Sequence, residues 1–295
     1  LFTFQYQMKQ IKNFISLTRL NKPIGFMLLF WPCLWGLTLA YHYKNGGIIY
    51  LKYIFLFFLG AVLMRSAGCI FNDVVDRNLD KKVLRTKERP IASGKVSVFK
   101  ASIYIISLCL LALLILIQFN FLTIVLGISS MFFAFAYPFM KRITYWPQLF
   151  LGLTFNWGII MGYSSITNNI SLEVVILYIS AIFWTLGYDT VYGLQDIHDD
   201  EIIGVKSTSI KFKNNVKVFV GICYSLFILG VLLVGFIMEI NQYFFTLPIF
   251  FVLILLLVYQ ANNFKINNPE SCLLNFKRNN LIGMFLFFTI FSFNL

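Results

Sequence analysis

Residues 52–80 read KYIFLFFLGAVLMRSAGCIFNDVVDRNLD, an apolar stretch that runs directly into a group of acidic residues. The part from residue 52 to residue 71 is long enough to cross a hydrocarbon core of about 30 Å as a helix. Asn72, Asp76 and Asp80 follow it at intervals of four, which places them on one face if the helix continues. This stretch therefore predicts a membrane-spanning helix that leads into a polar site.

The whole chain has the composition of an integral membrane protein. Of 295 residues, 59% are apolar and only 12% are charged, and the mean hydropathy of +0.79 lies outside the range of ordinary soluble domains. We expect an all-α, polytopic bundle of about nine transmembrane helices in a single domain over residues 1–295. The predicted spans are residues 24–42, 52–71, 100–118, 121–139, 147–165, 172–193, 216–238, 243–261 and 280–294.

The positive charge follows the alternation of these spans. Lys and Arg crowd the amino-terminal segment 1–23 and the loop after the second span, and they recur in every second loop, whereas the opposite side receives only Lys44 and Lys52. Because cytoplasmic loops of membrane proteins carry the Lys and Arg excess, we expect the amino terminus in the cytoplasm. The net charge of +12 then reflects membrane topology and argues against a nucleic-acid-binding surface.

The acidic residues are concentrated in two clusters. Of only 12 Asp and Glu, most follow the second span or surround the end of the sixth span. Both clusters follow even-numbered spans, so the same alternation places them on the cytoplasmic side. The clusters are Asp73, Asp76, Asp80 and Glu88, and Asp189, Asp196, Asp199, Asp200 and Glu201. Since Asp196 and Asp200 repeat the interval of four, the two clusters predict one shared site.

The spacing of these acids favours a magnesium-bound diphosphate. Like charges four residues apart destabilise a helix, so the repeated arrangement calls for a compensating cation. Mg²⁺ prefers carboxylate oxygens and completes its shell with water and substrate phosphates. Arg85, Arg89 and Lys206 lie close to the acids in sequence and suit the remaining phosphate oxygens. Solvated loop charges are the simpler alternative, which the matched spacing of the two clusters disfavours.

Two further arginines stand out. Arg65 lies within the second span, where an unpaired charge is costly, so we expect it to face the bundle interior and pair with an acid, with substrate contact as the alternative. Arg142 follows the fourth span beside Lys141 and is a candidate for binding an acceptor carboxylate or a phosphate.

Other function classes find less support. No Gly-rich phosphate loop or Ser-His-Asp order is present, which argues against an ATP-driven pump or a serine hydrolase. His42 and His198 are the only histidines and cannot assemble a His-based zinc site. An ion transporter or channel predicts polar residues at the bilayer midplane in several spans, but here the span centres are apolar.

The motifs resemble the UbiA superfamily of intramembrane aromatic prenyltransferases over almost the whole chain. MRSAGCIFND (64–73), which leads into Asp76 to Asp80, RTKERP (85–90) and Ser93-Gly94 are similar to the first signature of that superfamily. YDTVY (188–192), DIHDD (196–200) and IGVKST (203–208) are similar to the second. Within the superfamily, RLNKPIG (19–25), Trp31-Pro32 and YPFMKR (137–142) resemble the 4-hydroxybenzoate polyprenyltransferases of ubiquinone biosynthesis.

This resemblance implies a reaction and a set of site residues. It implies Mg²⁺-dependent transfer of a polyprenyl group from polyprenyl diphosphate to the ring carbon ortho to the hydroxyl of 4-hydroxybenzoate, in a central cavity open to the cytoplasmic face. The catalytic loops are expected at about 72–99 and 194–215. The expected magnesium ligands are Asn72 and the catalytic residues Asp76, Asp80, Asp196 and Asp200. The expected substrate-binding residues are Asn72, Arg19, Arg77, Arg85, Arg89, Lys141, Arg142, Asp189, Tyr192 and Lys206. Arg142 is expected to help bind the aromatic acid.

Some alternatives stay open within the superfamily. A haem farnesyltransferase or a naphthoate or homogentisate prenyltransferase is the nearest rival, and a panel of acceptors separates these. We expect the bacterial inner membrane rather than a mitochondrion, because no transit pattern precedes the first apolar segment. The expected partners are the two substrates and the lipid bilayer, with no nucleic acid and no obligate protein partner.

Overall fold

The computed structural model describes residues 2–41, 47–239 and 243–293, and no strand occurs among them. This confirms the predicted all-α class. The α-helices are α1 (Phe2–Thr18), α2 (Ile24–Leu39), α3 (Gly47–Val75), α4 (Arg77–Asp80), α5 (Val98–Leu116), α6 (Phe121–Ile143), α7 (Pro147–Thr167), α8 (Leu172–Gly193), α9 (Ile197–Ile203), α10 (Thr208–Lys211), α11 (Val216–Ile237), α12 (Tyr243–Asn262) and α13 (Pro269–Phe293). A 3-10 turn, Leu194–Asp196, joins α8 to α9.

Each predicted span overlaps one long helix, but the predicted count of nine spans is not confirmed. In the described part of the chain, seven helical segments are long and apolar enough to cross a membrane: α3, α5, α6, α7, α8 with its continuation to Ile203, α11 and α12. Helix α2 is apolar but has only 16 residues. Helix α13 begins eleven residues before the predicted span, and its first half carries charged and amide side chains such as Glu270, Lys277 and Asn279.

Helices α2 and α7 approach closely through small residues. A Cβ added at Gly36 of α2 would overlap the backbone of Ile159, and one added at Gly162 of α7 would overlap the backbone at Cys33. Gly158 lies four residues before Gly162 on the same face of α7 and contacts Cys33 as well. Lipid is as apolar as the side chains, so the hydrophobic effect does not drive helices together within a membrane. Their association relies instead on close packing of this kind.

Helix α13 is fixed against α2 by the indole groups of two tryptophans. Trp31 Nε1 donates to Asn280 Oδ1 at 2.8 Å, and Trp35 Nε1 donates to the Gly283 carbonyl at 2.9 Å. Trp35 is fully buried. Because an unpaired polar group inside a bilayer costs several kcal/mol, these bonds satisfy buried donors and join the two ends of the chain.

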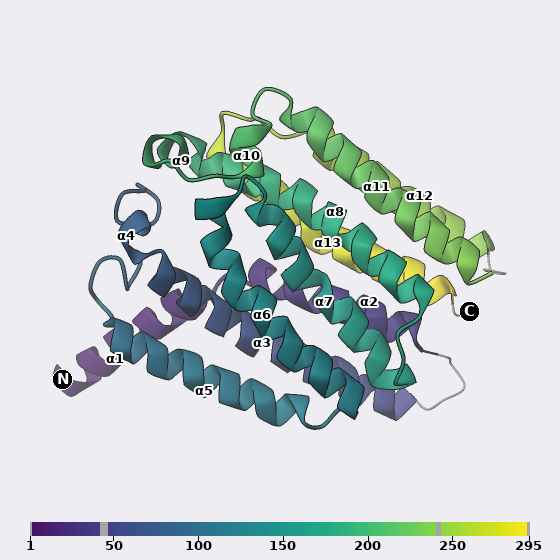
Figure 1. The fold of residues 1–295 in the computed structure, drawn as a ribbon, viewed down its shortest axis with the longest axis horizontal. Helices are drawn as coiled ribbons and strands as arrows, with labels where there is room; N and C mark the ends of the chain where they lie inside the picture. Colours follow the sequence, from purple (N-terminus) through teal and green to yellow (C-terminus); the bar gives the residue numbers. More distant parts are fainter. Residues whose placement is uncertain (1, 42–46, 240–242, 294–295) are drawn as a thin grey trace.

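The short helices α4, α9 and α10 gather at one end of the bundle, and α1 lies near the same end (Figure 1). The predicted amino-terminal segment 1–23 is largely helical, since α1 occupies most of it and packs beside α3 and α5. The rings of Phe14 and Tyr104 lie 5.1 Å apart, and Lys100 Nζ donates to Gln10 Oε1. The first acid-rich segment includes α4 and the second includes α9, so both segments lie at this end of the bundle.

Candidate active site

The first acidic motif lies where α3 ends. Helix α3 stops at Val75, and Asp76 has φ −93° and ψ 3° before α4 starts, so Asn72, Asp76 and Asp80 do not lie on one continuous helix. The backbone nevertheless keeps the spacing of four: Asp76 N donates to Asn72 O at 2.9 Å, and Asp80 N donates to Asp76 O at 2.8 Å. The side chains of all three residues line the same cavity.

The second acidic motif also follows a change in helix geometry. Helix α8 ends at Gly193, and the 3-10 turn carries Asp196 into α9. Helix α9 ends at Ile203 and is followed by Gly204, which has a φ of 78°. Only glycine adopts this left-handed conformation without strain. Asp189, Asp196 and Asp200 all line the cavity that the first motif lines.

Direct contacts join the two motifs. Arg85 donates from Nε and Nη2 to the two carboxylate oxygens of Asp196, at 2.7 and 2.5 Å. The backbone N of Leu84 donates to Asp199 Oδ2 at 3.0 Å. Residues more than 100 positions apart therefore meet, and the predicted shared location of the two motifs is found in the fold.

Basic residues also pair with the buried acids of the first motif. Arg89 bridges Asp73 and Asp80, at 3.1 and 2.9 Å, and Arg19 donates to Asp73 at 2.7 Å. Lys141 Nζ forms an ion pair with Asp76, which is only 1% exposed. Burial raises the pKa of Asp76 above its ordinary value, and the neighbouring Lys141 ammonium opposes part of that rise.

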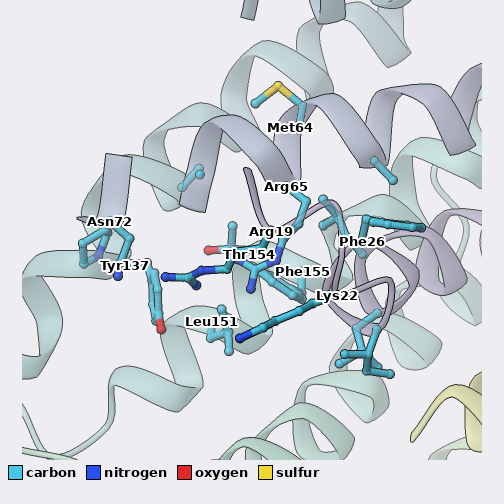
Figure 2. A pocket seen from close by; sticks show the side chains of 18 of the residues that line it. Arg19, Lys22, Phe26, Met64, Arg65, Asn72, Tyr137, Leu151, Thr154 and Phe155 are labelled. Carbon is cyan, nitrogen blue, oxygen red and sulfur yellow. The ribbon is translucent and has the colours of Figure 1, made fainter. Parts of the chain in front are cut away.

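A cavity of about 1290 Å³ extends from these ion pairs into the bundle. Its polar end is formed by the two motifs, and its apolar part is walled by α2, α3, α5, α6 and α7. Figure 2 shows Arg19, Lys22, Arg65 and Tyr137 gathered in one part of it. One end of the cavity therefore suits a charged group and the other a hydrocarbon chain.

Arg65 lies in the cavity wall, as expected for a residue facing the bundle interior. None of the direct ion pairs among the described residues involves Arg65. The acid with which its charge interacts is Asp189, which lines the same cavity. Its guanidinium carbon lies 5.4 Å from the centre of the Phe155 ring. Its Nε is buried and has no hydrogen-bond partner among the described residues. An arginine with a free donor inside a cavity is available to a ligand carboxylate.

Most of the predicted site residues line this cavity, and a few do not. The lining includes Arg19, Asn72, Asp76, Asp80, Arg85, Arg89, Lys141, Asp189, Tyr192, Asp196 and Asp200. Arg77 and Arg142 instead line a smaller neighbouring pocket of about 520 Å³. Arg142 donates to the Val75 carbonyl at 2.8 Å, and Lys206 donates to the Ile143 carbonyl at 3.2 Å.

The cavity lining also contains polar residues outside the predicted set of site residues, among them Asp73 and Tyr188. Asp73 is 1% exposed and accepts hydrogen bonds from Arg19 and Arg89, so it anchors two of the cations at the polar end. The Tyr188 hydroxyl is buried without a hydrogen-bond partner among the described residues. Asp73 belongs to the first acidic cluster, but it falls outside the spacing of four that selected Asn72, Asp76 and Asp80. Tyr188 is adjacent to Asp189, and no sequence signal distinguished its side chain from those of packing residues.

The donor atoms at the polar end fit a magnesium diphosphate better than a metal held by protein alone. Among the described residues, no group of three or more His, Cys, Asp or Glu side chains is close enough to hold a metal ion. Mg²⁺ is often bound through only one or two carboxylates together with substrate phosphates. The cavity presents hard oxygen ligands on Asp76, Asp80, Asp196 and Asp200 and phosphate-binding cations beside them.

Comparison with known proteins identifies the relatives of this chain. The UbiA prenyltransferase family model matches residues 29–289. A Bos taurus protein named 4-hydroxybenzoate polyprenyltransferase, mitochondrial, is 42% identical over 97% of this chain and 76% of its own length. A Coxiella burnetii protein named 4-hydroxybenzoate octaprenyltransferase is 37% identical over 96% of each chain.

Solved structures share the fold at low sequence identity. A UbiA homologue from Aeropyrum pernix superposes with a TM-score of 0.73 at 19% identity, covering 88% of this chain and 94% of that one. A UbiA homologue from Archaeoglobus fulgidus bound to GPP and Mg²⁺ superposes with a TM-score of 0.71 at 17% identity, covering 95% and 99%. The helical bundle described above is therefore the architecture of these proteins.

Proposed function

This chain belongs to the UbiA prenyltransferase family, and from that premise we propose that it is a 4-hydroxybenzoate polyprenyltransferase of ubiquinone biosynthesis. It transfers a polyprenyl group from polyprenyl diphosphate to the ring carbon ortho to the hydroxyl of 4-hydroxybenzoate and releases diphosphate. The observation that carries this proposal is a single cavity with paired acids and cations at one end and an apolar wall at the other. We take residues 1–295 as one multi-pass membrane domain.

The polar end suits the diphosphate of the donor. Asn72 and the carboxylates of Asp76, Asp80, Asp196 and Asp200 would hold Mg²⁺, which neutralises the leaving diphosphate and so favours ionisation of the allylic C–O bond.

The cations at the same end bind the remaining phosphate oxygens. Arg85 and Arg89 offer several N–H donors each, and Lys141 adds a mobile ammonium group. The acids that these cations contact orient them toward the same space.

The aromatic acceptor fits between the polar end and the apolar wall. We assign its carboxylate to Arg65, because the Arg65 Nε is buried in the cavity without a hydrogen-bond partner among the described residues. Arg142 instead lines the smaller neighbouring pocket, where it donates to the Val75 carbonyl and pairs with Asp76 at 3.5 Å. Phe155 lies beside the Arg65 guanidinium and offers an aromatic face to the acceptor ring. The ring carbon forms the new C–C bond as the C–O bond breaks, the diphosphate takes the bonding electron pair, and the ring then loses its proton.

Prenylation of radiolabelled 4-hydroxybenzoate by membranes that contain the full-length protein tests this proposal. Lipid-extractable product is expected with Mg²⁺, and its formation should stop when EDTA is added. Asp76→Ala and Asp196→Ala should each lower the rate at least about a hundredfold, because each removes a carboxylate from the shared polar end. Glu88→Ala is the matched control, since the Glu88 side chain is 75% exposed and lies outside the cavity.

The same assay identifies the acceptor and tests the location of the reaction site. Product from naphthoate, homogentisate or haem but not from 4-hydroxybenzoate would reassign the acceptor. Full activity in both Asp variants would show that the polar end is not the reaction site.

The membrane orientation is a separate part of the proposal. We place the amino terminus and the polar end on the cytoplasmic side of a bacterial inner membrane, or on the corresponding side of a mitochondrial one, because the Lys and Arg excess lies at that end. Protease protection of an amino-terminal tag in inverted vesicles measures this, with digestion expected from the cytoplasmic side only.

A further inference from the structure

The residues of α3 that line the cavity repeat at intervals of four positions, most of them with an adjacent residue, which is the pattern of one helix face. They form a stripe that leads from the polar end to the deep apolar end of the cavity. In that direction the stripe contains Asn72, Gly68, Arg65, Met64, Ala61, Gly60 and Phe57. Two of its members are glycine, which costs roughly 0.5 to 1 kcal/mol each inside a helix relative to alanine.

Gly60 and Gly68 differ from the other glycines of the cavity wall. A Cβ added at Gly127 would overlap the Leu116 side chain, and one added at Gly158 would overlap Cys33, so these two glycines permit close packing. A Cβ added at Gly60 or Gly68 would meet no atom within 4 Å. These two positions therefore leave open space in the cavity instead of accommodating a neighbouring helix.

The positions of these glycines along α3 correspond to different parts of a prenyl chain. With a rise of about 1.5 Å per residue, Gly68 lies about 6 Å and Gly60 about 18 Å from Asn72 along the helix axis. Three backbone bonds of an extended peptide cover about 3.5 Å, so a four-bond isoprene unit covers about 5 Å. Gly68 then lies beside the first units of a chain whose diphosphate is at the polar end, and Gly60 beside the third or fourth.

Beyond Gly60 the cavity is bounded by large apolar side chains. The rings of Phe57 and Phe119 lie 4.7 Å apart, and Phe119 is 8% exposed. Leu116 lines this end as well and contacts the backbone of α6 at Gly127. A side chain added at Gly60 would therefore narrow the route between the polar end and this deep end.

We propose that Gly60 is a residue that determines how long a prenyl chain the cavity accepts, by leaving open the space beside the third and fourth isoprene units. This inference rests on the proposed prenyltransferase function. The Cβ of Gly60→Leu meets no atom within 4 Å and its side chain extends into that space. Donors of two units therefore remain accepted and donors of many units are rejected. Gly68→Leu fills the space beside the first units and impairs both donors.

The experiment compares geranyl diphosphate, with two units, and octaprenyl diphosphate, with eight, as donors to 4-hydroxybenzoate in proteoliposomes of the full-length protein. Gly60→Leu is expected to lower kcat/KM for octaprenyl diphosphate at least about tenfold more than for geranyl diphosphate. Gly68→Leu is expected to lower both values. Gly221→Leu is the matched control: Gly221 lies in α11, outside the cavity lining, and a Cβ there also meets no atom within 4 Å.

Binding is measured in parallel, as the rise in apparent Tm of each purified variant with either diphosphate and Mg²⁺. Wild type should be stabilised by both donors and Gly60→Leu by geranyl diphosphate alone. If Gly60→Leu changed kcat/KM equally for the two donors and was stabilised equally by both, the inference that Gly60 determines prenyl chain length would be overturned. Wild type that binds both donors but transfers neither would instead overturn the proposed function, while the binding comparison still decides the role of Gly60.

Discussion

Replacing Arg89 by methionine removes a side chain that bridges two buried carboxylates while keeping much of its apolar stem. Arg89 donates to Asp73 at 3.1 Å and to both oxygens of Asp80, at 3.1 and 2.9 Å. Asp73 is 1% exposed and Asp80 is 6% exposed, whereas the Arg89 side chain is 20% exposed. The substitution therefore leaves negative charge in a place from which most water is excluded.

The contacts set the expected size of the effect. Removal of one partner of a buried ion pair costs about 3 to 5 kcal/mol. Asp73 keeps its contact with Arg19 at 2.7 Å, so chiefly Asp80 loses its partner. The expected loss of unfolding free energy for Arg89→Met is therefore at the lower end of that range, about 3 kcal/mol. At about 2 to 4 °C per kcal/mol for a chain of this general size, the apparent Tm should fall by about 6 to 12 °C.

Thermal unfolding of the detergent-purified protein, without substrate, measures this change. Lys95→Ala is the control, because the Lys95 and Glu88 side chains are 46% and 75% exposed and their ion pair of 3.3 Å is worth at most about 1 kcal/mol. Combining Arg89→Met with Asp80→Asn should recover part of the loss, since the uncompensated charge is then removed. If Arg89→Met shifts the Tm no more than Lys95→Ala does, the buried bridge does not stabilise the fold.

Three further outcomes are expected. Arg65→Gln should raise the KM for 4-hydroxybenzoate at least about tenfold with little change for the donor, because it removes the charge assigned to the acceptor carboxylate; equal increases for both substrates would refute that assignment. The Mg²⁺ concentration for half-maximal activity should rise as the pH is lowered from neutral, because burial raises the pKa of Asp76 above its ordinary value and protonation removes a metal ligand; an unchanged requirement would argue against Asp76 as a ligand. Gly283→Ala should lower the apparent Tm by several degrees, at about 1 to 3 kcal/mol for overpacking, because the added methyl overlaps the Trp31 ring; Gly221→Ala, which meets no neighbour, should not lower it.

The helices and the identity of the two acidic motifs could be predicted from sequence because both depend on local pattern. An apolar run of about twenty residues must satisfy its backbone hydrogen bonds within itself in lipid, so its helical state does not depend on its neighbours. Helix α8 matches its predicted bounds, residues 172–193. The sequence left open whether Asn72, Asp76 and Asp80 lie on one helix, because a spacing of four residues does not distinguish one helix from two helices separated by a single residue.

The positions of the basic residues were harder to predict. Arg85 and Lys206 both lie near the acids in sequence, yet Arg85 contacts Asp196 in the cavity while Lys206 donates to a backbone carbonyl. Arg142 lies far from both motifs in sequence, yet it reaches the Val75 carbonyl and Asp76. A long flexible side chain reaches partners on several sides of its helix. Which partner it meets depends on how helices distant in the sequence are placed.

A membrane-embedded helical protein with two acid-rich motifs on one side follows from the amino-acid sequence, because hydropathy, charge alternation and acid spacing are properties of short segments. The three-dimensional packing was needed to show that Arg85 joins the two motifs, that the Arg65 Nε has no hydrogen-bond partner among the described residues, and that Gly60 borders open space. Each of these depends on the packing of helices far apart in the chain, since a cavity is defined by what several helices leave unfilled.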